Sequence, residues 1–392
     1  MPGPLDGFRI LDLSAVISGP FATMILADQG AEVIKVEPPD TGDFTRSAGN
    51  QQGGLSASFL NNNRNKRSVV LDLKRADHVE ALKRMAATAD AMVQNFRPGV
   101  VERLGIGYED MRAVNPRLVY VSISGFGEVG PWSHKPVYDP IIQALSGLCS
   151  IQGGSDERRP RLLRTIVPDK VTALTASQAI TAALLARSRT GEGQHVRLSM
   201  LDAIVAFLWS SDMGSQTFVG KDISLQRAAS FLDLIYETTD GYMAVSTMTN
   251  PQWQAFCRAS GNPDWIDDPR FATTALRDLN IDARLELIQS AMITKSSDEW
   301  LAILDEAGVP CAPVLHRKQM INHPQVVAND IVREYEHEVA GRLRQARPAA
   351  RFEGTSPEYR FGARVLGADS ADVLAEIGYS PEEVAALLAA AR

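Results

Sequence analysis

Residues 9–37 read RILDLSAVISGPFATMILADQGAEVIKVE, and this stretch decides the fold. The aliphatic run Arg9–Leu13 predicts a β-strand, and the turn at Ser18–Pro20 leads into a helix that we expect to end near Gln29. Glu32–Glu37 predicts a second strand, which two prolines close. Strand, helix and strand at this spacing are typical of a parallel sheet with helices packed on its faces.

The same alternation continues over the first 200 residues. We expect further strands at Ser68–Leu73, Ala91–Asn95, Arg117–Ser124 and His195–Leu198, and helices at 76–89, about 140–148 and 171–188. These elements predict an α/β fold with a doubly wound sheet, in which ligands bind at the carboxyl ends of the strands. From about residue 225 the pattern changes to a hairpin over 232–246, followed by helices. We therefore expect a large domain over 1–205 and a smaller α+β domain over 225–330.

The composition excludes several classes of protein. The chain has 392 residues, a formal net charge of -7 and 45% hydrophobic residues, which argues against broad nucleic-acid binding. No stretch approaches the roughly 20 apolar residues that span a bilayer, and Met1–Phe8 does not read as a signal peptide. Three separated cysteines (Cys149, Cys257 and Cys311) predict a cytoplasmic protein without disulfides.

Familiar phosphate, metal and hydrolase motifs are absent from the sequence. It contains no G-x-x-x-x-G-K-[ST], no H-E-x-x-H and no G-x-S-x-G, so we expect no P-loop, no metal site and no hydrolase nucleophile elbow. Gly125–Gly130 matches G-x-G-x-x-G, but Pro131 and Trp132 follow instead of a helix, which favours a flexible loop. His134 lies in the same loop and reads as a surface residue.

Asp169 is the carboxylate that we consider as a candidate catalytic residue. It stands in Val167-Pro-Asp-Lys170, just before the helix that we expect from Val171, where an aspartate is most simply an N-cap. A carboxylate at a helix N-terminus in an apolar cavity could equally act as a nucleophile. Two groups of basic residues, at 64–67 and at 95–97 with Arg103, form either a solvated face or a phosphate-binding site.

These motifs, taken in order, carry a family resemblance. The chain resembles the class III coenzyme A transferases, the CaiB/BaiF family that includes formyl-CoA transferase and α-methylacyl-CoA racemase. The resemblance covers at least the first 205 residues and, more loosely, the whole length. The matching segments are PLDGFRILDL (4–13), GP (19–20), GAEVIKVE (30–37), GD (42–43), NKRS (65–68), LDLK (71–74), NFRPG (95–99), RLG (103–105), YD (138–139), QALSG (143–147), RTGEGQ (189–194) and SMLD (199–202).

The resemblance implies a fold and a site. The fold is a Rossmann-like large domain to which 340–392 returns, a small domain between, and an interlocked homodimer. Asp169 takes the place of the catalytic aspartate, coenzyme A thioester is a substrate, and no tightly bound cofactor is expected. The implied partners are an acyl-CoA and a small carboxylic acid, with no nucleic acid and no membrane. The implied CoA-binding positions are Val16, Ile17, Ser18, Leu71, Lys74, Asn95, Phe96, Arg97, Arg103 and Tyr138.

Two departures bear on the substrate. Pro38 stands where some relatives have an arginine that stacks on adenine. The glycine-rich loop that covers the active site in formyl-CoA transferase has no counterpart between about 225 and 250, so an acyl group other than formyl or oxalyl is expected.

Three functions remain open on the sequence. A transferase would use Asp169 to form an aspartyl anhydride and then an aspartyl-CoA thioester. A racemase would need a histidine where this chain has Tyr138, and tyrosine ordinarily holds its proton to about pH 10; His134 lies four residues upstream. The third is a CoA-binding protein without catalysis. Arg158, Arg159, Arg161 and Arg164 precede Asp169, either as a solvated loop or as a site for a second carboxylate.

Overall fold

The computed structural model describes residues 2–154, 158–220 and 234–389. The chain divides into two compact units. One consists of residues 1–217 and 330–392, and the other of residues 218–329.

The first unit is built on a six-stranded sheet in the order β5-β2-β1-β6-β7-β8, with every neighbouring pair parallel. This confirms the predicted α/β fold with a central parallel sheet. The strands are largely buried, as expected for a parallel sheet covered on both faces. They are β1 (Arg9–Asp12), β2 (Glu32–Glu37), β5 (Lys66–Val70), β6 (Ala91–Gln94), β7 (Val119–Ser124) and β8 (His195–Ser199).

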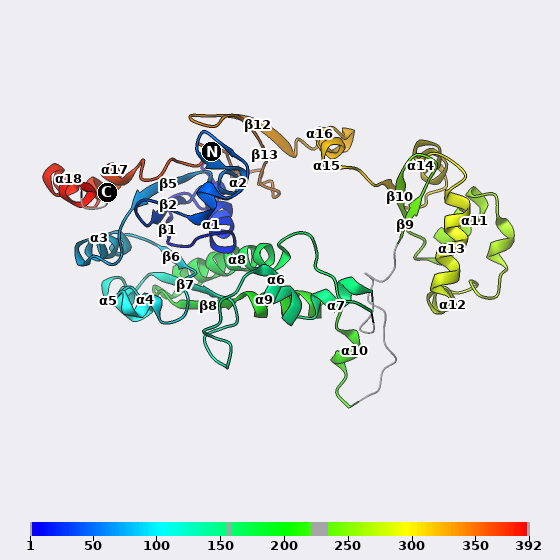
Figure 1. The fold of residues 1–392 in the computed structure, drawn as a ribbon, viewed down its shortest axis with the longest axis horizontal. Helices are drawn as coiled ribbons and strands as arrows, with labels where there is room; N and C mark the ends of the chain where they lie inside the picture. Colours follow the sequence, from blue (N-terminus) through cyan, green and yellow to red (C-terminus); the bar gives the residue numbers. More distant parts are fainter. Residues whose placement is uncertain (1, 155–157, 221–233, 390–392) are drawn as a thin grey trace. The chain divides into compact units, whose positions relative to one another are not determined.

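Helices cover both faces of this sheet (Figure 1). On one face α1 (Ser18–Asp28) packs against α8 (Val167–Thr190), and small side chains such as Ala22 and Ala176 let the two helices approach the strands closely. The other face is covered by α3 (Ala76–Ala87), α5 (Tyr108–Val114), α17 (Ser370–Glu376) and α18 (Pro381–Ala389). Segments from both ends of the chain therefore share one core.

The rest of the first unit consists of short elements. Among them, α6 begins at Asp139, immediately after a loop from β7, and its position matters for the site below. The short elements are α2 (Ala57–Asn63), α4 (Val100–Arg103), α6 (Asp139–Leu145), α7 (Leu148–Gly153), α9 (Met200–Trp209), α10 (Gly214–Thr217), the 3-10 helix η1 (Phe44–Ser47), and two hairpins, β3 (Gln51–Gln52) with β4 (Leu55–Ser56) and β12 (Val332–His337) with β13 (Gly341–Ala346).

The second unit is a small antiparallel sheet with helices. Its sheet has the order β11-β10-β9, and its core includes Trp253, Phe256 and Trp300. Part of the predicted hairpin falls on residues 232–233, which lie outside the described residues. The elements are β9 (Ile235–Glu237), β10 (Tyr242–Val245), α11 (Asn250–Ala259), the 3-10 helix η3 (Pro263–Ile266), α12 (Thr274–Leu279), α13 (Ile281–Met292), α14 (Ser297–Glu306), β11 (Cys311–Pro313), α15 (Arg317–Met320) and α16 (Pro324–Ala328).

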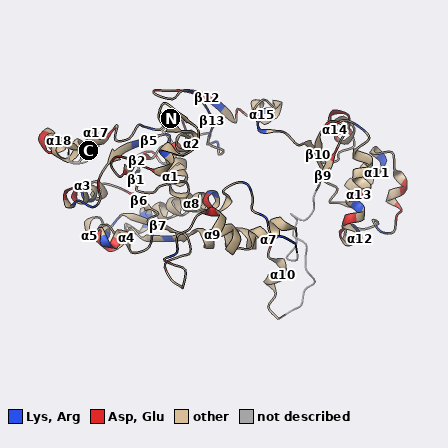
Figure 2. Cartoon of the chain, in the orientation of Figure 1, with Lys and Arg blue, Asp and Glu red and all other residues tan. Residues whose placement is uncertain are grey.

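Charged residues of both signs are interspersed along the elements (Figure 2). Within the described ranges, no helix is long and apolar enough to cross a bilayer. The same ranges contain no group of three or more His, Cys, Asp or Glu side chains that could hold a metal ion.

Candidate active site

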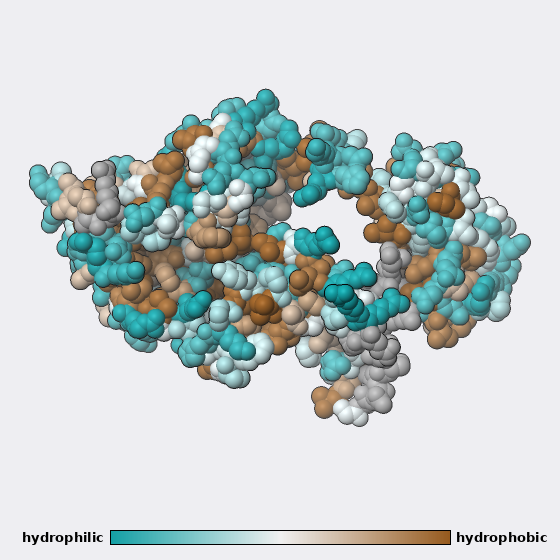
Figure 3. Space-filling model, viewed as in Figure 1, coloured by the Kyte–Doolittle hydropathy of each residue, from teal (hydrophilic) through white to brown (hydrophobic). Residues whose placement is uncertain are grey.

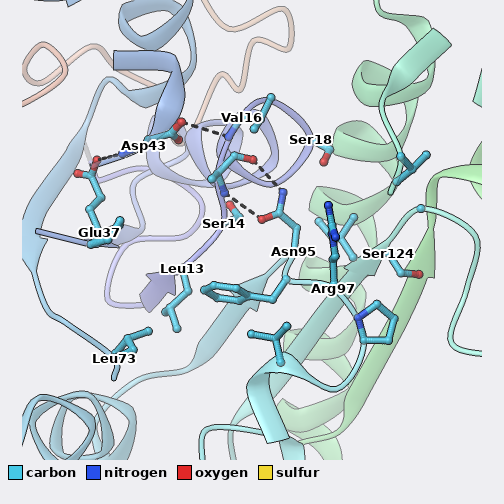
Figure 4. A pocket seen from close by; sticks show the side chains of 18 of the residues that line it. Leu13, Ser14, Val16, Ser18, Glu37, Asp43, Leu73, Asn95, Arg97 and Ser124 are labelled. Atoms are coloured by element: carbon cyan, nitrogen blue, oxygen red, sulfur yellow. Dashed lines mark hydrogen bonds between the residues drawn. The ribbon is translucent and has the colours of Figure 1, made fainter. Parts of the chain in front are cut away.

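A cavity of about 590 Å³ opens at the carboxyl ends of the central strands. The strand order reverses between β1 and β6, and such a switch point is where parallel α/β sheets bind ligands. Ser14–Val16 follow β1 and Asn95–Arg97 follow β6, so the two loops on either side of the reversal line the cavity (Figure 4).

Most of the residues expected from the family resemblance meet in this cavity. Ile17 and Arg103 are not among the lining residues: Ile17 caps α1, and Arg103 is an exposed residue of α4. Pro38, the departure from the family pattern, does line the cavity. The expected residues that line it are Val16, Ser18, Leu71, Lys74, Asn95, Phe96, Arg97, Tyr138 and Asp169.

The loop after β1 is held in an unusual conformation. Val16 has φ 71°, a left-handed conformation that is a true outlier for a β-branched residue. Two side chains clamp it. Asp43 accepts the Val16 N–H at 3.2 Å, and Asn95 both accepts the Ala15 N–H at 2.9 Å and donates to the Ala15 carbonyl at 2.8 Å (Figure 4). The clamp fixes the direction in which α1 leaves the cavity.

Buried ion pairs support this clamp from below. Lys35 lies 3.0 Å from Asp43 and donates to the Ser14 carbonyl at 2.8 Å. Glu37 accepts the Asp43 N–H and pairs with Arg46. Each of these buried charges therefore has an opposite partner, which offsets part of the cost of its burial.

Within the basic run at 64–67, Arg64 and Lys66 form neither a solvated face nor a phosphate site, so both alternatives were wrong for them. Arg64 and Lys66 are buried, and they pair with Asp28 at 2.7 Å and Asp12 at 2.9 Å. Three other cations, Lys74, Arg97 and Lys135, do line the cavity with exposed side chains. Lys135 also lies 3.4 Å above the ring of Trp132.

Asp169 belongs to α8 and lines one end of the cavity. The helix begins at Val167, so Asp169 is its third residue and not the N-cap that its sequence position suggested. Pro168 fits because a proline in the first helical turn loses no hydrogen bond. Burial, together with the negative charge of Asp139, raises the pKa of Asp169 to about 6, while hydrogen bonds from the Ser18 hydroxyl and amide act in the opposite direction.

Asp139 is a second carboxylate behind the first, and it is only 2% exposed. It accepts the backbone N–H of Asp169 at 3.2 Å and the side-chain amide of Gln143 at 2.6 Å. Burial raises the pKa of Asp139 as well. An apolar cavity that holds a raised-pKa aspartate against a helix N-terminus suits nucleophilic chemistry.

Comparisons with known proteins agree with this geometry. The model of CoA-transferase family III matches residues 5–370. The chain belongs to CoA-transferase family III. Mouse succinyl-CoA:glutarate CoA-transferase is 34% identical over 381 residues, covering 95% of this chain and 86% of that protein. Acetyl-CoA:oxalate CoA-transferase of Acetobacter aceti is 36% identical over 336 residues, covering 84% and 85%.

Solved structures of family III give the same result. A CaiB/BaiF family protein from Brucella suis superposes with a TM-score of 0.82 at 29% identity, covering 96% of this chain and 100% of that one. The family and the enzyme class that the sequence motifs indicated are therefore confirmed.

Residues that separate the branches of family III can also be placed. Tyr138, where the racemase branch needs a histidine, lines the cavity and is 72% exposed. His134 is exposed and is not among the lining residues. Gly125 lines the cavity, whereas the amide of Gly127 already donates to the Ser124 hydroxyl at 3.1 Å.

Sequence reasoning missed several residues that build this family III site. Asp139 stands in the motif YD (138–139) and opens a helix, which was the available signal for it. Asp43 stands in the motif GD (42–43), but its contact with Val16 spans 27 residues and cannot be read from the sequence. For Lys135, the only feature in the sequence that indicated a place in the site was its position in the loop after β7.

Proposed function

We propose that this protein moves coenzyme A from an acyl-CoA donor to a carboxylic acid acceptor, with Asp169 as the nucleophile. The observation that carries the proposal is that the half-buried Asp169 opens into a cavity lined by exposed cations at the switch point of the sheet. The family of the chain and the activities for which its relatives are named support the same activity.

The proposed chemistry uses Asp169 first as a nucleophile and then as the carrier of an activated acyl group. A carboxylate oxygen of Asp169 attacks the thioester carbonyl, the C–S bond breaks, and an aspartyl anhydride forms with release of CoA thiolate. The thiolate attacks the aspartyl carbonyl, which gives an aspartyl-CoA thioester and frees the first acid as its carboxylate. The acceptor carboxylate then attacks this thioester, the C–S bond breaks, and a second anhydride forms with release of the thiolate. The thiolate attacks the acceptor's carbonyl in this anhydride, which gives the new acyl-CoA and frees the Asp169 carboxylate. One thioester replaces another, so no external energy source is required.

Residues around Asp169 suit both halves of this cycle. A pKa of about 6 leaves the carboxylate mostly ionised at neutral pH, yet more basic than an ordinary aspartate. The Ser18 amide and hydroxyl act to lower the pKa of Asp169, and they are the proposed donors to the oxyanions that form on this carboxylate. The Gly127 amide, which is already paired, is a weaker candidate for that role.

Coenzyme A would occupy the cavity with its phosphates near Lys74, Arg97 and Lys135. These side chains are exposed and line the same cavity as Asp169, and phosphate groups favour sites with several cations. Leu71, Asn95 and Phe96 supply the apolar and amide contacts beside them. We propose residues 1–205, with 340–392, as the large CoA-binding domain and 225–330 as the small one.

An interlocked homodimer is part of the proposal. Four large apolar side chains on α8 and α9, namely Leu174, Leu185, Phe207 and Trp209, are about half exposed. Figure 3 shows apolar residues at the surface over these two helices. A surface of this kind supports association with a second copy. A cytoplasmic location is proposed from the three free cysteines.

Replacing Asp169 with Asn tests the mechanism directly. We expect CoA exchange to fall by at least about 10³-fold while CoA binding persists, because the amide fills the same space but cannot form the anhydride. Hydroxylamine should trap an acyl group on the wild-type aspartate and none on the variant. Exchange at the normal rate in D169N would contradict the proposal, and deuterium entering the α-carbon without CoA exchange would favour a racemase.

A further inference from the structure

Gln143 is a buried polar residue of α6, beside the carboxylate pair at the end of the cavity. It is 2% exposed. It stands four residues after Asp139 in the same helix, so the two side chains lie on one face of α6, one turn apart. Burying an amide costs free energy unless its donors and acceptor find partners. The partners of Gln143 therefore show what its side chain does.

The chain that leads into α8 fixes the orientation of this amide. The Leu163 N–H donates to Gln143 Oε1 at 2.9 Å, so the oxygen must face Leu163. The NH2 group then takes the other position, where it donates to the Thr165 carbonyl at 3.3 Å and to Asp139 Oδ1 at 2.6 Å. The reverse orientation would set an oxygen against a carbonyl and a carboxylate. Gln143 therefore faces Asp139 as a donor.

Asp139 in turn uses both of its oxygens as acceptors. Oδ1 accepts the Gln143 amide, and Oδ2 accepts the Asp169 N–H at 3.2 Å. That N–H belongs to the first turn of α8, whose N–H groups have no partner within the helix. Ile166, at the N-cap position, makes no side-chain hydrogen bond to this turn. Asp139 thus supplies the missing acceptor from another helix, and donors on both oxygens favour its ionised form.

Few charges act on the two carboxylates. Burial raises the pKa of Asp139, while the hydrogen bond from Gln143, the Asp169 N–H and the charge of Lys170 lower it. Burial and the charge of Asp139 raise the pKa of Asp169, and the Ser18 hydroxyl and amide lower it. Four exposed arginines before α8 neither line the cavity nor belong to these charges, namely Arg158, Arg159, Arg161 and Arg164. Gln143 is thus the main contact that opposes the effect of burial on Asp139.

We propose that Gln143 is a positioning residue for Asp169, acting through Asp139, an inference that rests on the proposed function. By donating to Oδ1, it keeps the Asp139 carboxylate ionised and turned so that Oδ2 accepts the Asp169 N–H. By accepting the Leu163 N–H, it also ties the chain before α8 to α6. Gln143 does not line the cavity, so its action on the reaction is indirect.

The variant Q143M tests this role, because methionine keeps the length of the side chain and loses both polar atoms. Asp139 then loses the donor on Oδ1, so we expect its pKa to rise. The charge beside Asp169 weakens, and the pKa of Asp169 should fall below about 6. Carbon-13 NMR of the full-length protein, labelled at the aspartate carboxyl carbons, measures both titrations, and D139N and D169N assign the two signals.

Opposite movements of the two pKa values distinguish positioning from a structural role. If Q143M merely loosened the packing and admitted water, both pKa values would fall, because burial is the first cause of each raised value. The control is Q325M, which removes an exposed amide from α16 and should titrate as the wild type.

Activity gives a second measurement, the exchange of isotopically labelled acetate into acetyl-CoA. In Q143M we expect the ratio of kcat/KM at pH 5 to that at pH 8 to rise roughly three- to tenfold, since more of Asp169 is ionised at acid pH. Q143E should keep more activity than Q143M near pH 6 and lose it at higher pH, because a carboxyl that shares a proton with Asp139 can still donate to it.

The double variant D139N/Q143M decides whether Gln143 acts through Asp139. In D139N the charge that Gln143 maintains is gone, so adding Q143M should change neither the Asp169 titration nor the ratio of rates. Three outcomes would overturn the inference: a fall in both pKa values in Q143M, a loss of kcat/KM by the same factor at every pH, or an equally large effect of Q143M in the D139N background. Failure to trap an acyl group on wild-type Asp169 from any acyl-CoA would overturn the proposed function instead, and the NMR titration would still decide the role of Gln143.

Discussion

The carboxylate of Asp139 accepts the backbone N–H of Asp169, with 3.2 Å between the two atoms. The same contact brings a second negative charge beside the proposed nucleophile, and burial together with that charge raises the pKa of Asp169 to about 6. Asp139 thus places Asp169 and makes it more basic at once. Both effects follow from the start of α6 lying beside the start of α8.

Replacing Asp139 with Asn separates these two effects. The amide removes the negative charge but keeps an oxygen that can accept the Asp169 N–H, so we expect the pKa of Asp169 to fall toward its ordinary value. The acid limb of kcat/KM against pH should move to lower pH. In D139A, Asp169 N–H and the Gln143 amide lose their partner, and we expect a loss of about 1–3 kcal/mol in unfolding free energy. An unchanged pH profile in D139N would contradict the electrostatic role.

The pH dependence of the wild type follows from the same carboxylate. Asp169 must be ionised to attack, so kcat/KM should rise about tenfold per pH unit below pH 6 and level off above it. A raised pKa in the folded state also means that ionising Asp169 opposes folding: its contribution to stability is present at low pH and is lost as the pH rises through about 6. We therefore expect D169N to be more stable than the wild type at pH 7.5 by roughly 1 kcal/mol in urea unfolding. Lower stability of D169N at that pH would argue against a strained carboxylate.

Ser18 acts on Asp169 in the opposite direction to Asp139. Its hydroxyl and amide donate to the carboxylate and lower the pKa of Asp169. In S18A the hydroxyl is lost, so we expect the acid limb to move to higher pH and kcat/KM at pH 6 to fall by about tenfold, with a smaller loss at pH 8. S188A, an exposed serine near the far end of α8, is the control and should leave the profile unchanged. A loss in S18A that is uniform across pH would assign the hydroxyl to oxyanion stabilisation or to packing, and would contradict its effect on the pKa of Asp169.

Much of the sheet could be predicted because its strands are buried on both faces. Short segments rich in Val and Ile, such as Glu32–Glu37, are typical of strands in a buried parallel sheet. The start of α8 was misplaced because Pro168 reads as a helix boundary, although a proline is well tolerated in the first turn. Helix boundaries predicted from such local rules are wrong by a few residues. Here the predicted start was four residues too late, so Asp169 was interpreted as an N-cap although it lies in the first turn.

Ion pairs between residues far apart in the chain were harder to predict from the sequence than the strands and helices. Arg64 and Lys66 read as a surface cluster, yet Asp28 and Asp12, which neutralise them, lie 36 and 54 residues away in the chain. The contacts of Asp43 and Asn95 with the loop after β1 could not be predicted for the same reason. Asn95 and its partner Ala15 are 80 residues apart in the chain. Most of the residues named from the family resemblance line one cavity, but the resemblance could not say which cations were already paired.

The buried pair of Lys66 and Asp12 supports the sheet beneath the cavity. Both side chains are almost fully buried, and their charged atoms are 2.9 Å apart. In K66M the carboxylate of Asp12 loses this partner, and we expect unfolding free energy to fall by about 3–5 kcal/mol in urea. The double variant D12N/K66M should recover part of the loss, because no unpaired charge remains. Equal losses in the single and double variants would show that packing, and not charge, controls this position.

Val16 stores strain at the mouth of the cavity, and glycine there should release it. A β-branched residue with φ 71° lies about 1–3 kcal/mol above an allowed conformation, whereas glycine adopts this conformation freely. We expect V16G to gain about 1 kcal/mol in urea unfolding, after the extra freedom of glycine in the unfolded chain is subtracted. It should also bind CoA less tightly in calorimetry, since Val16 lines the cavity and its loop would sample more conformations. V16A removes the same apolar contact but keeps a restricted backbone. If V16G were less stable than V16A, the clamp by Asp43 and Asn95 would not be holding a strained residue.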